Sequence, residues 1–206
     1  MQKYRITSGY CPGAGDNGKT KASFNGKRKS KGGSDTEFYG AVEELQCRLD
    51  KFLVGNYQAS EEAIAILTWL RSALPSVNSF CYLEGKSEDH AFPDSFKKFV
   101  IEQQEVWAIY APALEFQRFT SENTVELYYI GIQVRAVERA YVKWEESLEC
   151  SSSLDDQKRI SEQGIIWNRL SKLFWAIAKR EEWLQADSPV YWTGKMPECT
   201  LKVANA

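Results

Sequence analysis

Apolar residues that recur every three to four positions are the feature that most constrains the fold of this 206-residue chain. The pattern predicts helices over about 35–54, 61–74, 96–110, 121–149 and 160–186. Ser60 followed by Glu61 and Glu62 is typical of a helix start. Pro75 predicts where that helix ends, with a loop over 75–93. Without strand alternation or a repeat, the chain is predicted to be all-α, a five-helix bundle.

Both ends of the chain lack this pattern. Residues 1–34 are rich in glycine and lysine and are predicted to form an irregular arm, a loop or short strand with special turns. The tail over 188–206 contains Pro189, Gly194 and Pro197 and is predicted to be irregular. With the bundle assigned to 35–187, the chain fits one domain that is long enough to bury a core.

Charge is distributed unevenly between the arm and the bundle. Residues 1–36 carry eight lysines and arginines against Asp16 and Asp35, so this segment has a net charge of +6. The whole chain has a net charge of −2, which leaves −8 on the remainder. A basic arm on an acidic body suggests an anionic ligand at their junction, or docking of the arm onto the body.

The cysteine pattern argues against a protein-bound metal. The chain has Cys11, Cys47, Cys81, Cys150 and Cys199. No two of them have Cys-x-x-Cys spacing and only His90 could assist them, so a zinc site is not expected. Neither a signal peptide nor an 18-residue apolar run is present, so we expect a cytoplasmic protein with no membrane contact.

The arm formally matches a phosphate-binding loop, because Gly13 stands five residues before Gly18-Lys19-Thr20. Such a loop follows a buried strand and opens a helix, whereas residues 21–33 are polar and glycine-rich. We therefore reject the P-loop fold but keep its chemistry, in which backbone N–H groups and lysines surround phosphate.

A nucleic-acid interface is a lesser alternative for the same arm. Lys27-Arg28-Lys29 and Lys31 place four cations within five residues, which would bind a phosphate backbone. Only Phe24 could stack on bases, and the body is acidic, so nucleic acid is not the favoured partner.

Arg135, Glu138 and Arg139 share one face of the fourth predicted helix. One interpretation is a surface ion pair within the helix. The three residues interrupt an apolar stretch, however, so we expect Arg135 to be partly buried. A buried arginine needs a carboxylate or phosphate partner.

Asn168 and Arg169 lie in the middle of the fifth predicted helix. For Arg169, exposure on the surface is slightly favoured over a role in binding. Asn168 is a poor helix former, which favours a hydrogen-bonding role.

Taken in order, these segments resemble motifs of the ATP:cob(I)alamin adenosyltransferases of the propanediol-utilisation type. The counterparts are Gly13 to Gly18, Lys31-Gly32-Gly33, Gly40 to Leu45, Arg135 to Arg139 and Asn168 to Lys172, and they span about residues 10–180. The resemblance implies a homotrimeric five-helix bundle with active sites between subunits. It also implies transfer of the 5′-deoxyadenosyl group of ATP to a reduced corrinoid, with release of triphosphate.

The same resemblance implies which residues act. ATP contacts would come from Gly13, Ala14, Gly15, Asp16, Thr20, Lys31, Arg135, Glu138, Arg139 and Asn168. Arg135 would hold the polyphosphate and Glu138 the nucleoside, as the catalytic pair. Phe116, or Phe119 in an alternative alignment, would displace the lower ligand of the corrinoid, and Glu43 would also face the corrinoid. Mg²⁺ would arrive with ATP, and a corrinoid-dependent acceptor enzyme would be a further partner.

Several positions depart from the family pattern. Pro12 and Ala14 replace two loop threonines, and Gly32-Gly33 replaces an Asp-Asp pair. Glu43 replaces an aspartate, and Gly131 replaces the arginine that pairs with it. A catalytically silent nucleotide- or corrinoid-binding carrier or regulator of the same fold is therefore the alternative function.

Overall fold

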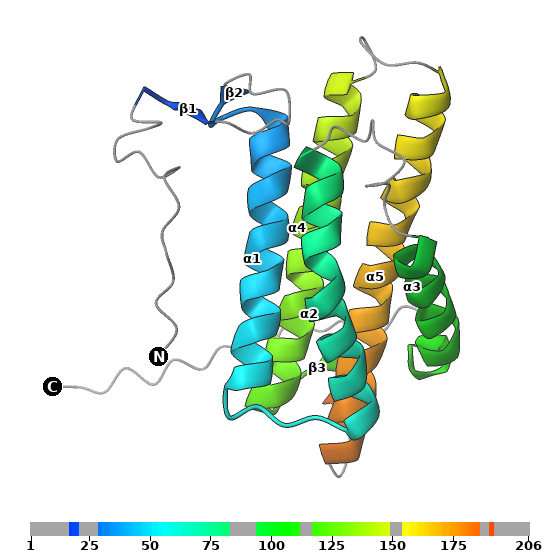
Figure 1. Ribbon diagram of the computed structural model, residues 1–206. Coiled ribbons are helices and arrows are strands. Elements are labelled where there is room, and N and C mark those ends of the chain that lie inside the picture. The colour runs from blue at the N-terminus through cyan, green and yellow to red at the C-terminus, as the bar shows by residue number, and fades with distance from the viewer. Residues whose placement is uncertain are drawn as a thin grey trace, which may run out of the picture.

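The computed structural model describes residues 17–20, 29–82, 94–111, 117–148, 154–185 and 190–191. Its body consists of five long helices arranged side by side (Figure 1). These are α1 (Ser34–Val54), α2 (Glu61–Tyr82), α3 (Asp94–Trp107), α4 (Glu122–Leu148) and α5 (Leu154–Gln185). A short 3-10 helix, η2 (Ala108–Tyr110), follows α3. The predicted all-α fold is confirmed.

The described residues also form two short antiparallel strand pairs outside the helices. In the arm, β1 (Lys19–Thr20) pairs with β2 (Lys29–Ser30). Beyond the bundle, β3 (Gln117–Arg118) pairs with β4 (Val190–Tyr191). The irregular tail was therefore predicted wrongly at Val190–Tyr191, because pairing with a distant strand leaves no local sequence signal. The proposed boundaries at 34/35 and 187/188 remain predictions.

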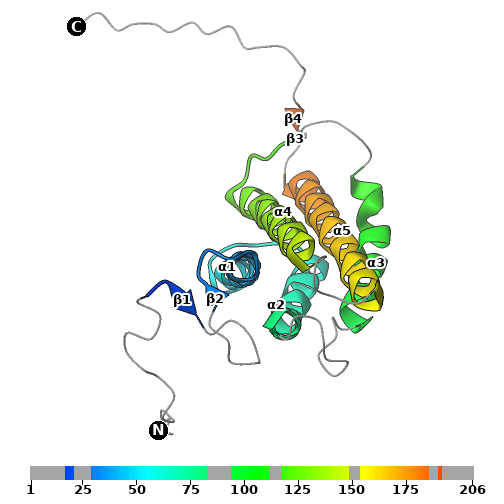
Figure 2. The same ribbon diagram turned by 90° about the horizontal axis from the view of Figure 1, so that it is seen from above.

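The core draws buried side chains from all five helices, with α4 packed against both α1 and α5, and Figure 2 shows the bundle end-on. The largest fully buried side chains are Trp144, Trp167, Tyr141, Phe38, Phe52, Phe96, Phe174, Leu45, Leu49 and Leu67. Phe38 of α1 contacts Tyr141 edge-on at a centroid distance of 5.1 Å and stacks on Trp144 at 5.4 Å. Phe38 also contacts Trp167, so the aromatic cluster joins α1, α4 and α5. Aromatic contacts of this kind contribute about 0.5–1.5 kcal/mol each beyond area burial.

Helix α2 does not end at Pro75, contrary to the sequence prediction, but continues to Tyr82. A proline inside a helix removes one hydrogen bond and costs roughly 3 kcal/mol. Pro75 is exposed, whereas Leu74 and Val77 beside it are fully buried. Burying two such side chains contributes about 1.5–3 kcal/mol each, which outweighs the cost of the proline.

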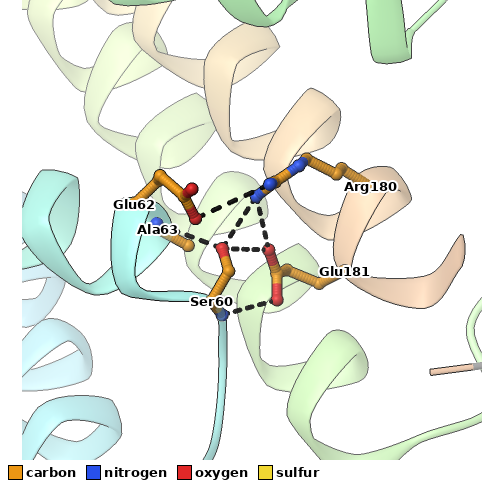
Figure 3. Close-up of polar contacts among 5 residues, drawn as sticks. All are labelled: Ser60, Glu62, Ala63, Arg180 and Glu181. Atoms are coloured by element: carbon orange, nitrogen blue, oxygen red, sulfur yellow. Dashed lines mark hydrogen bonds and ion pairs between the residues drawn. The ribbon is translucent and has the colours of Figure 1, made fainter. Parts of the chain in front are cut away.

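Ser60 caps α2, as predicted. Its hydroxyl accepts a hydrogen bond from the N–H of Ala63 at 3.3 Å, and its carbonyl accepts one from Ile64 at 3.0 Å. The buried carboxylate of Glu181, at the end of α5, accepts hydrogen bonds from the Ser60 N–H (2.8 Å) and hydroxyl (2.6 Å), as Figure 3 shows. Arg180 completes this cluster by donating to the Ser60 hydroxyl oxygen at 2.8 Å. The last turns of α5 therefore hold the start of α2.

Glu182 holds the start of α4 in the same way. Its carboxylate is fully buried and accepts hydrogen bonds from the N–H and hydroxyl of Thr120 and from the hydroxyl of Thr124. Thr124 lies in the first turn of α4, where partial positive charge from the helix dipole favours a carboxylate. Two consecutive glutamates thus bind the beginnings of two different helices.

Candidate active site

Arg135 and Arg139 lie on a solvent-facing stripe of α4 that is otherwise apolar. The stripe consists of Val125, Tyr128, Ile132, Arg135, Arg139 and Val142, all exposed. The partial burial predicted for Arg135 is wrong, because the inward positions next to it are occupied by Val134 and Val137, which are fully buried. Spacings of three and four residues keep the whole stripe on one face.

Neither arginine is neutralised by another described residue. Within the ranges that the structure describes, Arg135, Glu138 and Arg139 make no ion pair and no side-chain hydrogen bond. The alternative of an ion pair within the helix is thus not realised. Guanidinium groups without a carboxylate partner are available to bind phosphate in bidentate geometry.

A cavity of about 180 Å³ opens beside Arg135, between α4 and α5. Its lining combines two cations, a hydroxyl and two aromatic rings: Arg135, Lys172, Ser171, Tyr128 and Trp175, together with Gly131 and Ile132. Such a lining suits an anionic group next to a flat ring. Sequence reasoning did not select Lys172 or Trp175, although Lys172 closes the Asn168 to Lys172 motif and both follow Asn168 at helical spacing.

Gly131 permits the close approach of α4 and α5 at the cavity. A Cβ atom at this position would lie 3.1 Å from the Cβ of Phe174, closer than ordinary packing allows. Phe174 is fully buried, so it has little room to move. The glycine therefore favours the close packing of the two helices, in addition to replacing a longer side chain beside the cavity.

The two remaining candidates on α5, Asn168 and Arg169, lie on different faces of the helix. Gly131 faces Phe174 and Gly164 faces Tyr141, which fixes an antiparallel register between α4 and α5. This register brings exposed Asn168 to about the level of Glu138. Arg169, on another face of α5, pairs instead with Gln104 at 3.2 Å and Glu105 at 3.8 Å. The surface role favoured for Arg169 stays a prediction, and the structure places this half-buried side chain against α3.

The described part of the arm forms a short two-stranded antiparallel hairpin at the start of α1. Gly18 has a positive φ of 73°, and its carbonyl accepts a hydrogen bond from Lys31 N–H at 2.9 Å. The hairpin is attached to α1 through Thr36, whose hydroxyl donates to the Ser30 carbonyl at 3.1 Å, and through an ion pair of Lys29 with Asp35 at 2.8 Å. Lys31 is exposed and free to contact an anion.

Within one chain, the hairpin and Arg135 do not meet. The start of α1 contacts the end of α4, where Lys143 pairs with Glu37 at 2.5 Å and Ser34 bonds Ser147 at 2.9 Å. Arg135 lies about 12 Å further along α4 and borders the cavity next to α5. Thr20 and Lys31 are thus separated from the cavity residues that they were predicted to join.

Two further predictions concern the corrinoid. Glu43 is exposed on α1 and makes no ion pair with a described residue. Phe116, like Gly13, Ala14, Gly15 and Asp16, lies outside the described residues. Phe119, the alternative to Phe116, is half-buried and stacks on Tyr128 at a centroid distance of 4.7 Å, which places it beside the cavity.

Two broader features of the described ranges concern membranes and metal ions. No helix there is both long and apolar enough to cross a membrane. No group of three or more histidine, cysteine, aspartate or glutamate side chains is positioned there to hold a metal ion.

Comparison with protein families identifies the chain. Residues 11–181 match the model of the cobalamin adenosyltransferases. The chain belongs to this family. The match covers the arm, the stripe on α4 and the cavity, so the cobalamin adenosyltransferase assignment rests on the same segments as the site. No match was found among proteins with curated functions.

Solved structures of the family share the fold. An arginine-to-lysine variant of the PduO-type ATP:co(I)rrinoid adenosyltransferase from Lactobacillus reuteri, complexed with ATP, is 19% identical, with a TM-score of 0.66 over 89% of this chain and 99% of its own. A phenylalanine-to-alanine variant from the same organism, complexed with cobalamin and ATP, is 18% identical, with a TM-score of 0.69 over 88% and 97%. At this identity the likeness supports the adenosyltransferase fold alone.

Proposed function

We propose that this protein transfers the 5′-deoxyadenosyl group of ATP to the cobalt of a reduced corrinoid. The electron pair of cobalt(I) attacks C5′ of ATP, a cobalt–carbon bond forms, the C5′–oxygen bond breaks, and triphosphate leaves. Because cobalt(I) is itself the nucleophile, the protein needs to position C5′ and neutralise the leaving group. Family membership supports this proposal, as do the cations beside the α4–α5 cavity, which form no ion pair with another described residue.

Arg135 carries the proposal. Its guanidinium lines the cavity, is exposed, and has no carboxylate partner among the described residues. Lys172 adds a second cation to the same lining, so the two can hold adjacent phosphates. Glu138 and Asn168 lie at one level and would contact the nucleoside, and Arg139 would extend the cationic surface by one turn.

The complete site would form between subunits of a homotrimer. The described hairpin of the arm and the cavity of one chain are separated, yet the family motifs require both around ATP. A second chain could bring its Thr20 and Lys31 onto the exposed stripe of α4, whose apolar members Val125, Ile132 and Val142 favour coverage by protein. This arrangement would place Arg135 at a subunit contact.

Other partners follow from the reaction. Mg²⁺ would be held mainly by the phosphates of ATP, since the described residues offer no cluster of carboxylates. Glu43 and the Phe116 segment would face the corrinoid. The adenosylated product would pass to a corrinoid-dependent enzyme, and a cytoplasmic location remains a prediction from the sequence.

The test is an anaerobic assay with Mg-ATP and chemically reduced cob(I)alamin, in which the absorption spectrum of the corrinoid is monitored. We expect conversion to adenosylcobalamin, reduced roughly a hundredfold or more in Arg135→Ala. Arg71→Ala is the control, because Arg71 of α2 pairs with Asp50 of α1, and neither residue lines the cavity. ATP binding without any spectral conversion by the native protein would instead indicate a silent carrier.

A further inference from the structure

Trp175 lies between two lysines on one face of α5. Lys172, Trp175 and Lys179 follow one another at spacings of three and four residues, which places them in one row along the helix. Lys172 is exposed, Trp175 is half-buried and Lys179 is only 2% exposed, so the row runs from the surface into the protein. Lys172 and Trp175 line the α4–α5 cavity. The indole therefore separates an exposed lysine of the cavity from a buried one.

The buried ammonium group of Lys179 lies against the indole of Trp175. Its Nζ is 4.4 Å from the centroid of the ring, which is within the range of a cation–π interaction. Lysine is rarely buried this deeply without compensation, and indole is the aromatic ring that attracts a cation most strongly. One face of Trp175 is thus occupied by a charge inside the protein, and this contact restricts the orientation of the ring.

The three residues that follow Lys179 have a different role. Arg180 and Glu181 hold the start of α2 (Figure 3). Glu182 holds the start of α4. Lys179, by contrast, contacts a side chain of the cavity wall. The last turns of α5 therefore support the α4–α5 cavity as well as the helix starts.

The second aromatic ring of the cavity is also held by a neighbouring side chain. Phe119 stacks on Tyr128 of α4, with ring centroids 4.7 Å apart. Because Gly131 faces Phe174, Tyr128 and Trp175 lie within about one helical turn of each other on the adjacent helices α4 and α5 (Figure 2). Rings that are fixed before a ligand arrives lose little entropy on binding, so the cavity is preorganised for a flat ring.

We propose that Lys179 is a positioning residue, which holds the Trp175 indole as the wall on which a conjugated ring of the substrate stacks. Indole rings stack favourably on conjugated rings. The inference rests on the proposed adenosyltransferase function for the identity of that ring. The reaction supplies two candidates, the adenine of ATP and the corrin of the corrinoid, which share this chemistry.

A positioning residue acts only through the side chain that it holds. Removing the charge of Lys179 should weaken binding while the indole of Trp175 is present, and should have no further effect once the indole is absent. A lysine that merely stabilised the bundle would weaken binding equally in both backgrounds. A double-mutant cycle separates the two cases.

The test uses the full-length protein and measures Kd by anaerobic titration calorimetry. The ligands are Mg-ATP, and then cob(II)alamin added to the protein with Mg-ATP and no reductant. Lys179→Met removes the charge, Trp175→Leu removes the ring, and the double variant combines the two. Lys97→Met and Trp183→Leu are the matched controls, since they change the same residue types outside the cavity. Circular dichroism verifies the fold of each variant, and Lys179→Gln replaces Lys179→Met if the latter does not fold.

We expect Lys179→Met and Trp175→Leu each to raise Kd roughly tenfold, the double variant to bind no worse than Trp175→Leu, and the controls to bind like the native protein. The ligand whose Kd changes more contains the stacked ring. Additive losses in the double variant would overturn the proposal, as would native Kd values for both ligands in Trp175→Leu. These titrations need no turnover, so a native protein without adenosyltransferase activity would refute the proposed function and leave the role of Lys179 to the Kd values.

Discussion

The buried carboxylate of Glu182 accepts a hydrogen bond from the hydroxyl of Thr124 and so joins the end of α5 to the start of α4. Thr124→Val keeps the shape of this side chain but removes the hydroxyl from a charged acceptor. We expect a loss of about 1.5–3 kcal/mol in the free energy of unfolding, measured by denaturant titration. Thr68→Val on the exposed face of α2 should change stability by less than about 0.5 kcal/mol. Equal effects of the two substitutions would contradict a stabilising role for the contact.

Glycine to alanine substitutions should have opposite effects on α4 and α1. Gly40 is exposed within α1 with no neighbour near its Cβ position, so Gly40→Ala should stabilise by about 1 kcal/mol. In Gly131→Ala, the 3.1 Å contact with Phe174 adds an overpacking cost of about 1–3 kcal/mol. Thermal unfolding should thus show a higher Tm for the first variant and an unchanged or lower Tm for the second. A similar increase in both would show that α5 moves freely away from α4.

Lys172 provides a test of the cavity that does not depend on Arg135. Lys172→Ala should raise the KM for ATP about tenfold, because one cation is lost from the polyphosphate site. Arg169→Ala removes a cation from the same helix, but from a face that contacts Gln104 and Glu105, and should leave KM unchanged. Equal kinetics for both variants would move the polyphosphate away from this cavity.

The carboxyl group of Glu62 should titrate below its ordinary pKa of 4.5. The hydrogen bond from its own backbone N–H is the main cause of the lowered pKa, and the charge of Arg180 adds to it. A lowered pKa in the folded state stabilises the protein above pH 4.5, and this contribution is lost as the pH falls through the folded-state value. NMR titration of the side-chain carboxyl carbon should show the pKa rising in Arg180→Met while staying below 4.5. A pKa at or above 4.5 in the native protein would refute this account.

Helical periodicity predicted most of the bundle because each core-facing stripe is local in sequence. The stripe from Phe38 to Phe52 predicted α1 almost to the residue. The end of α2 was wrong because the buried neighbours of Pro75 contact distant helices and outweigh a local rule. The pairing of Val190–Tyr191 with Gln117–Arg118 was not predicted for the same reason.

The candidate site was only partly accessible to sequence reasoning. Spacing placed Arg135 and Arg139 on one face correctly, but exposure depends on which face the bundle covers, and Arg135 proved exposed. Lys172 and Trp175 could be selected only once the register of α4 against α5 was known. The sequence indicated only that Gly131 replaces an arginine of the family pattern. That a Cβ atom at this position would crowd Phe174 depends on the packing of α4 against α5.

Glu181 and Glu182 stand at the end of the last helix of the bundle, yet they bind the beginnings of α2 and α4. A ribosome makes these two residues after all the residues of α1, α2, α3 and α4. Both earlier helices must therefore wait for the final turn of α5 before their N-termini are held, so the bundle remains incomplete until residues 181 and 182 have been made. A chain truncated before residue 181 would lose two helix starts at once, although neither of those helices would be missing a residue.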